Sequence, residues 1–222
     1  SSCPVGASTF SPCVPGTIEP YGGRVRCAEC EGGTFQNATG QTICQACRSG
    51  FFCPPGAAAA LPCMSGRYGD TSNLSASDQC IVSPAGSFST TGSGKPQMCA
   101  AGSYQQNEGR SACNLCEPGR NQSAKGSTGC EACPNRTYAS ITGSAECNNC
   151  LERLSSYQGS IECDVCDAKY YKLNAQTKAT PEECVPCAQE GAGCPTNTTL
   201  DTIYVRPGHW RLSGLSRLLN KC

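Results

Sequence analysis

The residues of this chain that could do the most chemistry are its cysteines, which number 22 among 222 residues. Most lie in Cys-x2-Cys pairs separated by about thirteen residues. Sulfur atoms at this spacing can form disulfides, bind zinc as thiolates, or cycle between thiol and disulfide forms. Cys113, Cys116, Cys130 and Cys133, for example, have nearly the spacing of a zinc ribbon.

Composition favours the disulfide interpretation over the other two. A cysteine content near one residue in ten is typical of a disulfide scaffold, and such scaffolds persist in oxidising compartments. Thioredoxin-type redox chemistry needs a βαβ setting, which the sequence does not suggest. We therefore expect an extracellular or cell-surface protein with no metal site and no other cofactor.

The cysteines belong to a repeat with a period near 17 residues. A unit opens with Cys, carries Gly three residues on and an aromatic residue five residues on, and has a later Gly four residues before its closing Cys. The opening positions are residues 13, 30, 47, 63, 83, 99, 116, 133, 150 and 166. The later Gly lies among polar residues, which predicts a turn with positive φ. We expect the early Gly to let the backbone pass close to a neighbouring disulfide, and the aromatic ring to cover that disulfide.

One unit has lost two cysteines together, because Ser83 stands at the opening position and Pro96 at the closing position. Joint loss predicts that the two positions are bonded to each other in the other units. Interleaved pairing would instead leave Cys80 and Cys99 without partners. The predicted disulfides are therefore Cys13–Cys27, Cys30–Cys44, Cys47–Cys53, Cys63–Cys80, Cys99–Cys113, Cys116–Cys130, Cys133–Cys147, Cys150–Cys163, Cys166–Cys184 and Cys187–Cys194. Around the short loops the pairs Cys47–Cys63 and Cys53–Cys80 remain an alternative.

This scheme leaves Cys3 and Cys222 unpaired within the chain. The segment from Cys3 to Cys13 matches that from Cys53 to Cys63 in spacing and in its Pro and Gly positions. Cys53 has Cys47 before it, so the partner of Cys3 is expected at a position before residue 1. We therefore expect the chain to begin and end within a longer array, with a bond between Cys3 and Cys222, or from Cys222 to another subunit, as the alternative.

The pattern Cys-x2-Gly-x-(Phe/Tyr) followed by Gly-x3-Cys-x2-Cys resembles the ephrin-receptor-like, or GCC2/GCC3, cysteine-rich repeat, over about residues 3–194. This family is similar in style to the small disulfide modules of tumour-necrosis-factor receptors. The segment 205–213 resembles one that follows such repeats in large surface proteins of protists, with His209 in place of a tyrosine. The resemblance implies extracellular, elongated and non-catalytic modules.

Catalysis and nucleic-acid binding have little support. Lys and Arg together number 17, as do Asp and Glu, so nothing favours a nucleic-acid partner. His209 is the one histidine, every internal cysteine has a structural assignment, and the acidic residues form no convincing pair. We expect no enzyme activity and no catalytic residue, and no run of about 20 apolar residues suggests a membrane span.

Glycans are the expected modification. Asn-x-Ser/Thr sequons stand at Asn37, Asn73, Asn121, Asn135 and Asn197. Asn121 is the best supported because a polar side chain, which we expect to be exposed, takes a place usually given to the aromatic residue. The abundant Ser and Thr could also carry O-linked glycans.

The last residues differ from the repeats. Residues 202–222 carry Arg206, Arg211, Arg217 and Lys221 and no acidic residue. Leu212, Leu215, Leu218 and Leu219 could form one apolar stripe, which with Trp210 is a candidate interface between subunits. The predicted organisation is cysteine-rich repeats at 1–62, starting within a module, tandem GCC2/GCC3-like repeats at 63–194, and a basic segment at 195–222.

These observations predict small disulfide-rich modules, in an elongated tandem array of short β-hairpin and loop units with little regular secondary structure. Each unit is expected to contact mainly its neighbours. The leading hypothesis is a glycosylated structural component of an extracellular filament, a mastigoneme-like flagellar hair or a surface coat, which associates with itself or with other filament subunits. The alternative is the stalk of a receptor or adhesion protein that binds a protein ligand.

Overall fold

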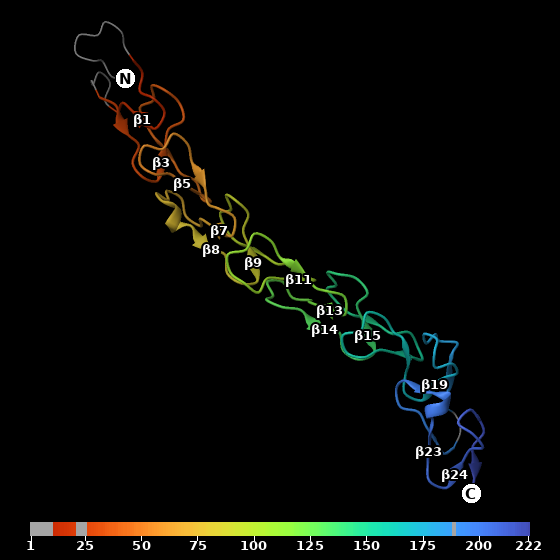
Figure 1. Cartoon of the computed structure of the whole chain (residues 1–222). Coiled ribbons are helices and arrows are strands. Elements are labelled where there is room, and N and C mark those ends of the chain that lie inside the picture. The colour runs from red at the N-terminus through yellow and green to blue at the C-terminus, as the bar shows by residue number, and fades with distance from the viewer. Residues whose placement is uncertain (1–10, 21–25, 188–189) are drawn as a thin grey trace. The chain divides into compact units, whose positions relative to one another are not determined.

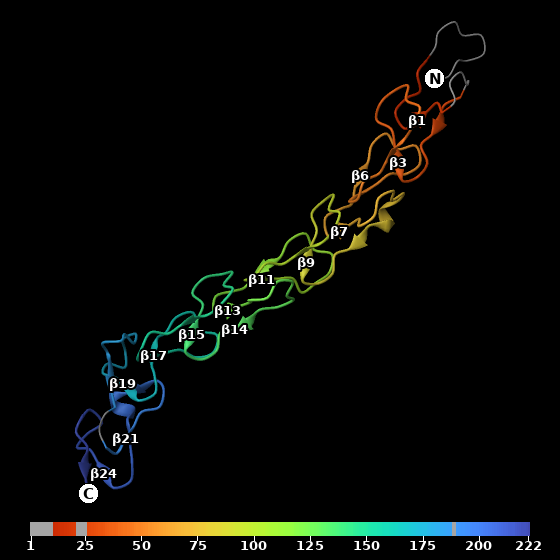
Figure 2. The ribbon, with the colours of Figure 1, turned by 180° about the vertical axis from the view of Figure 1, so that it is seen from behind.

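The computed structural model describes residues 11–20, 26–187 and 190–222. The chain divides into two compact units. The first comprises Ser1–Ala100, Tyr104–Asn114 and Lys125–Thr128, and the second Ala101–Ser103, Leu115–Ala124 and Gly129–Cys222. Each unit is a succession of short antiparallel hairpins (Figure 1; Figure 2). The expected fold class, a tandem array of short disulfide-rich hairpin modules, is confirmed.

The first unit contains five complete two-stranded hairpins. They are β1 (Thr17–Ile18) with β2 (Ala28–Glu29), β3 (Thr34–Phe35) with β4 (Gln45–Ala46), β5 (Phe51–Phe52) with β6 (Leu61–Pro62), β7 (Arg67–Tyr68) with β8 (Ile81–Val82), and β9 (Ser87–Phe88) with β10 (Gln97–Met98). A 3₁₀ turn, η1 (Ser77–Gln79), precedes β8. The hairpin of β11 (Ser103–Tyr104) and β12 (Asn114–Leu115) lies where the two units divide.

The second unit continues the same pattern and ends with a more elaborate group of strands. Its hairpins are β13 (Arg120–Asn121) with β14 (Glu131–Ala132), β15 (Thr137–Tyr138) with β16 (Asn148–Asn149), β17 (Leu154–Ser155) with β18 (Val165–Cys166), β21 (Ala192–Gly193) with β23 (Tyr204–Val205), and β24 (His209–Trp210) with β25 (Asn220–Lys221). Strand β19 (Tyr170–Lys172) pairs with β20 (Cys184–Pro186) and, in parallel, with β22 (Thr198–Thr199). A second 3₁₀ turn, η2 (Leu200–Thr202), follows β22.

Each repeat hairpin begins at a tight turn whose third residue has positive φ, which is glycine in most units and Arg136, Arg153 or Lys169 in three. We call a module the segment from one opening residue to the next and name it by that residue, so module 13 begins at Cys13. In module 13, the N–H of Thr17 donates to the carbonyl of Val14 at 3.0 Å, and Gly16 lies at the third turn position with φ +85°. A type II turn needs positive φ at that position, which glycine adopts without a steric penalty. The hairpin then closes when the next opening residue, Cys30, donates its N–H to the Gly16 carbonyl at 2.9 Å.

Three backbone hydrogen bonds join each module from module 13 to module 133 to the module that follows it. In the first unit the early Gly33 donates to the carbonyl of Cys53, the later Gly40 donates to that of Cys13, and Gln36 donates to that of Ala57, at 2.8, 2.8 and 3.1 Å. In the second unit the equivalent donors are Gly119, Gly143 and Gln122, and their acceptors are Ala139, Cys116 and Ser144. These bonds satisfy backbone groups that strands of two or three residues cannot pair by themselves.

The early glycine also reaches two modules along the chain, which corrects one expectation from the sequence. A Cβ atom added at Gly119 would lie 2.1 Å from the carbonyl oxygen of Gly159, and one at Gly33 would lie 2.4 Å from that of Asn73. The close neighbour of the early glycine is therefore a later turn, not a disulfide. The modules still contact mainly their neighbours through backbone hydrogen bonds, and the early glycine adds one contact two modules on.

Among the described residues, most of the buried hydrophobic side chains are cysteines. Cys47, Cys53 and Ala57 form one buried cluster, against which Phe35 of the preceding module packs. Cys63, Leu74 and Cys80 form another, against which Phe52 packs. The expectation that the aromatic residue of a module covers a disulfide is confirmed at these two positions, where the covered disulfide belongs to the next module.

Candidate functional site: the stapled module and its exposed side chains

Among the described residues there are ten disulfides, and nine of them join the opening cysteine of a module to a later cysteine of the same module. The ten disulfides join Cys13 to Cys27, Cys30 to Cys44, Cys47 to Cys53, Cys63 to Cys80, Cys99 to Cys113, Cys116 to Cys130, Cys133 to Cys147, Cys150 to Cys163, Cys166 to Cys184 and Cys187 to Cys194. Cys113, Cys116, Cys130 and Cys133 are thus bonded to other cysteines and carry no thiolate for zinc. Among the described residues, no group of three or more His, Cys, Asp or Glu side chains is placed to hold a metal ion.

The residue six places after the opening position lies in the interior of its module, which the sequence pattern did not reveal. In modules 30, 99 and 116 this residue is a glutamine, and its carboxamide braces the loop. The Nε2 of Gln36 donates to the carbonyl of Ile43 at 2.7 Å, while its Oε1 accepts from the N–H of Ala38 at 3.0 Å. Gln105 and Gln122 make the same two bonds to their own loops. The recurrence of Gln directly after the aromatic position was the signal for this brace.

This interior position also accounts for the way in which modules 47 and 83 are closed. In module 47 it holds Cys53, so the disulfide from Cys47 is short and closes at the interior position. In module 83 the same two positions hold Ser83 and Ser89, which are both fully buried. The hydroxyl of Ser83 donates to that of Ser89 at 2.7 Å. A serine–serine hydrogen bond therefore occupies the place of the short disulfide.

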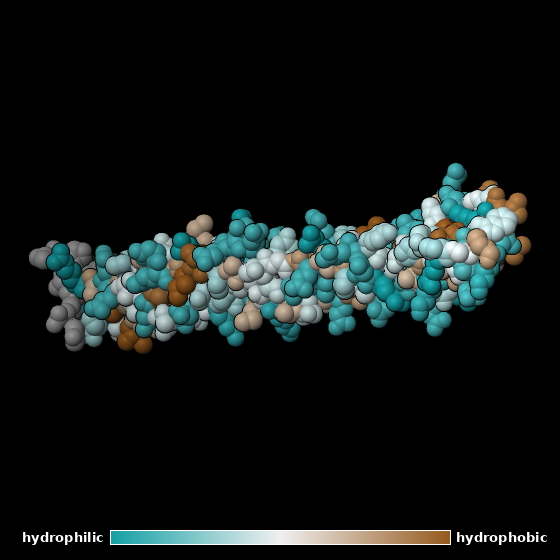
Figure 3. Space-filling model, turned by 90° about the horizontal axis from the view of Figure 1, so that it is seen from below, coloured by the Kyte–Doolittle hydropathy of each residue, from teal (hydrophilic) through white to brown (hydrophobic). Residues whose placement is uncertain are grey.

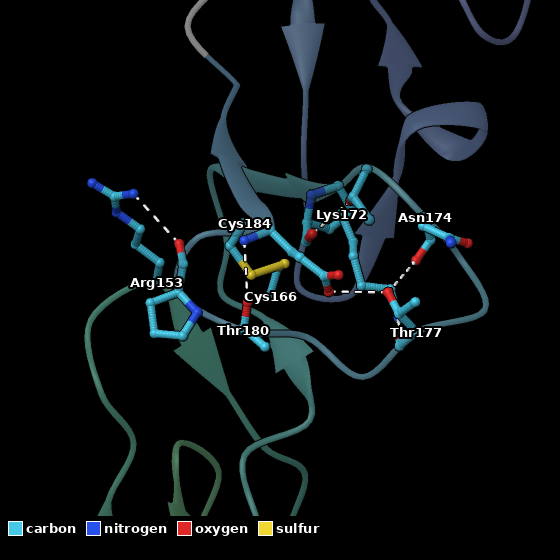
Figure 4. Close-up of a disulfide and its surroundings, with 11 residues drawn as sticks. Arg153, Cys166, Lys172, Asn174, Thr177, Thr180 and Cys184 are labelled. Carbon is cyan, nitrogen blue, oxygen red and sulfur yellow. Dashed lines mark hydrogen bonds between the residues drawn. A yellow bond between two sulfur atoms is a disulfide. The ribbon is translucent and has the colours of Figure 1, made fainter.

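The longest stapled loop, closed by Cys166 and Cys184, is held by a network of polar contacts (Figure 4). Lys172 lies at the interior position, is buried, and donates through Nζ to the carbonyl of Thr177. The hydroxyl of Thr177 donates to Glu183 Oε2 at 3.0 Å, and the N–H of Cys184 donates to the carbonyl of Thr180 at 3.1 Å. Outside the drawn group, a hydrogen bond from Lys178 to Glu162 raises the pKa of that lysine above its usual value. These polar groups thus form hydrogen bonds with one another and stabilise the loop.

The five sequon asparagines differ in how they are presented. Asn37, Asn73, Asn135 and Asn197 are exposed, and within the described part of the chain their carboxamides make no hydrogen bond. Asn73 and Asn197 both take the place of a later glycine, with φ +64°. Asn121 is half-buried, and its Nδ2 donates to the carbonyl of Ala145 at 3.2 Å. The expectation that the Asn121 side chain is exposed is therefore wrong, because the side chain takes the place of the aromatic ring and donates a hydrogen bond.

The C-terminal segment folds as a further module instead of presenting one stripe of leucines. His209 pairs with Lys221 and Trp210 with Asn220, in the register and spacing of the hairpin in module 13. Cys222 donates its N–H to the carbonyl of Gly208 at 3.0 Å, as an opening cysteine does. Counting back from this register places Val205 and Leu219 where Cys13 and Cys27 stand. A second cysteine pair is thus absent, and Gly208, Trp210 and Cys222 at repeat spacing were the signal for it.

The leucines of this module separate into two environments. Leu212, Leu215 and Leu218 are exposed, whereas Leu219 is half-buried and lines a cavity of ≈ 260 Å³ with Tyr171 and Ile203. The guanidinium of Arg211 donates to the carbonyls of Leu200 and Asp201, both at 2.7 Å. The expected single stripe is wrong because Pro207, Gly208 and Gly214 favour turns and the segment forms a hairpin.

The remaining candidates for chemistry have structural surroundings. His209 packs so closely on Gly191 that a Cβ atom added there would lie 2.4 Å from the imidazole Cγ. A hydrogen bond from Thr199 lowers the pKa of the neighbouring Asp201. Cys222 is exposed and free, while Cys3 lies outside the described residues. Within residues 11–20, 26–187 and 190–222, no helix has the length and apolarity needed to cross a bilayer.

The comparison with known families agrees with the module geometry. Residues 86–129 match the family model described as tyrosine-protein kinase ephrin type A/B receptor-like. Over these residues the chain fits the ephrin-receptor-like cysteine-rich repeat family. The matched segment begins at the early glycine of module 83 and includes strands β9 to β13, so the family's pattern persists across the unstapled module. No curated protein matches the chain at a significant level.

Ephrin-receptor-like modules of this kind are extracellular in type and are not themselves catalytic. The disulfide content points the same way, because structural disulfides are rare in reducing compartments. The match over residues 86–129 and the disulfide content therefore both favour an extracellular, cysteine-rich protein.

Proposed function

We propose that this chain is a glycosylated structural component of an extracellular filament or surface coat, such as a mastigoneme-like flagellar hair. The observation that supports this most is the set of three backbone hydrogen bonds repeated from module to module. Each module is closed by a covalent or hydrogen-bonded staple and is tied to its neighbour through main-chain atoms. Such a series tolerates side-chain variation on its surface and resists local unfolding.

Glycans at Asn37, Asn73, Asn135 and Asn197 fit this role. All four side chains are exposed, so a glycan there displaces no packing. A glycan at Asn121 would break the hydrogen bond to Ala145. Peptide mass spectrometry after enzymatic glycan removal should show Asn converted to Asp at these four positions and not at Asn121. A glycan found at Asn121 would contradict this expectation.

The match to an ephrin receptor-like model favours one alternative, the stalk of a receptor or adhesion protein that presents a ligand-binding domain. In that role the staples would keep a neighbouring domain at a fixed distance from the membrane. The two functions differ in where the protein is found, because a stalk stays with a membrane and a filament component does not.

Fractionation of the source cells tests the proposal. An antibody raised against residues 26–187 should label surface filaments or coat in electron micrographs and should stay with detergent-insoluble filaments. Release of the antigen together with integral membrane proteins by mild detergent would favour the stalk and overturn the filament proposal. An antibody to a known membrane glycoprotein of the same cells is the control for complete extraction.

A further inference from the structure

The C-terminal module exposes an unusual amount of apolar surface. Leu212, Leu215 and Leu218 lie within seven residues of one another and are 82%, 73% and 69% exposed. We call residues 211–219 the leucine loop. Hydrophobic residues, in brown, are visible on the surface of the C-terminal part, at the right of Figure 3. Burying such side chains against a partner is favourable by roughly 25 cal/mol per Å² of apolar area, so the loop is suited to contact.

The loop is also positively charged. Residues 202–222 contain four cationic side chains and no acidic one. Arg211 is engaged with backbone carbonyls. Arg206, Arg217 and Lys221 are exposed and form no ion pair or side-chain hydrogen bond within the described part of the chain. A partner surface that combines apolar side chains with carboxylates would match this arrangement.

Module 150 of the same unit, residues 150–165, has that complementary chemistry. Leu151, Tyr157 and Ile161 are 69%, 52% and 52% exposed. Glu152 and Asp164 are exposed and form no ion pair within 4 Å among the described residues, and Lys178 is near enough to attract Asp164 electrostatically. The one cation of the module, Arg153, donates to the carbonyl of Pro181 at 3.4 Å (Figure 4). The module therefore offers apolar side chains and unpaired carboxylates together.

We propose that the leucine loop of one copy binds module 150 of a second copy. The inference rests on the proposed structural function, for which it names a subunit contact. Both surfaces are solvent-exposed within one chain, so the leucine loop and module 150 of the same copy do not cover each other. Because the two surfaces differ, the contact is heterologous and either closes into a ring or propagates as a filament.

Sedimentation velocity on the C222S variant tests the contact without interference from the free thiol. We expect self-association that rises with concentration and weakens as salt is raised from about 50 mM to about 500 mM, because exposed charges are screened. Replacing the three leucines together with glutamine should weaken association at least about tenfold, which corresponds to about 1.4 kcal/mol. The matched control is I43Q, because Ile43 is 71% exposed but lies in the other unit. It should not change association.

Charge exchange identifies the partner surface. The variants R217E/K221E and E152K/D164K should each associate more weakly, and mixing the two should restore association because each pair of surfaces is again complementary. Failure of the mixture to recover, or a monomer at all concentrations, would overturn the contact. Leucine-dependent binding to vesicles of anionic phospholipid without self-association would overturn it in favour of a membrane. Neither result alters the fractionation test, so this contact and the filament function can fail independently.

Discussion

At the scale of single residues, two positions per module decide how it is closed. The opening residue and the residue six places later face each other in the interior, as Cys47 with Cys53 and as Ser83 with Ser89. A buried hydroxyl costs roughly 1–3 kcal/mol when it lacks a partner, so each serine is tolerated because the other is present. Lys172, Gln36 and their equivalents show that the interior position accepts polar side chains that bond to their own loop.

This pairing predicts that a short disulfide can be restored in module 83. The S83C/S89C variant should form a bond equivalent to that of Cys47 with Cys53, because the hydroxyl oxygens are 2.7 Å apart. Closing so short a loop should raise the free energy of unfolding by about 2 kcal/mol in the chain-entropy model. Thiol titration of the denatured, unreduced variant should find no more thiols than in the parent, and two additional thiols would show that the bond does not form.

The hydrogen bond itself can be measured with alanine variants. S83A leaves the Ser89 hydroxyl buried without its partner and should cost about 1–3 kcal/mol, whereas S83A/S89A should cost less than S83A alone. Urea unfolding of S83A, S89A, S83A/S89A and the parent gives the comparison. A double variant that loses as much as the sum of the single variants would mean that the two hydroxyls are not coupled.

The early glycine gives a second prediction at this scale. G119A places a Cβ atom 2.1 Å from the Gly159 oxygen on a backbone with φ +81°, so both the turn and the contact two modules on must shift. The left-handed backbone alone costs about 1–2 kcal/mol, and the clash adds to it. Gly129 is the matched control, since a Cβ atom there meets nothing within 4 Å. A thermal midpoint equal to that of G129A would contradict the assigned contact.

At the scale of elements, the spacing of the cysteines and glycines predicted the hairpins but not which modules contact each other. The joint loss of cysteine at positions 83 and 96 predicted pairing within a module, because a covalent bond links the two positions. The sequence could not predict which modules contact each other through the early glycine. The modules repeat similar residues, and a repeat period does not reveal which of them are in contact. Asn121 and the leucines were misplaced for another reason. Side-chain hydrogen bonding outweighed the assumption that a polar residue is exposed, and turn residues outweighed the assumption that the four leucines form one apolar stripe.

The second lost pair supplies a prediction about the C-terminal hairpin. If Val205 and Leu219 stand at staple positions, V205C/L219C in a C222S background should form a disulfide that closes a loop of about 15 residues, worth roughly 3 kcal/mol in the chain-entropy model. The increase in thermal midpoint should vanish on reduction. The single variant V205C, which adds a thiol without a partner, is the control, and a double variant that keeps two free thiols would contradict the register described for β24 and β25.

At the scale of the whole molecule, the positions of the disulfides along the chain determine which proteolytic cuts separate it into fragments. No disulfide among the described residues joins a cysteine before Ile81 to one after Met98. The loop of module 83 lacks the roughly 3 kcal/mol that a staple of ordinary length provides, and Thr90, Thr91 and Lys95 are exposed in it.

A protease of broad specificity should therefore separate the unreduced protein into two large fragments by cutting between Ser83 and Pro96. Cuts inside a stapled loop, by contrast, leave the pieces joined until reductant is added. Electrophoresis without and with reductant, followed by mass measurement of the fragments, distinguishes the two kinds of cut. In S83C/P96C, which places cysteines at the two lost positions, the same cut should no longer separate the fragments. If the first unreduced products of the parent end elsewhere, or appear only after reduction, module 83 is not the point at which the chain opens first.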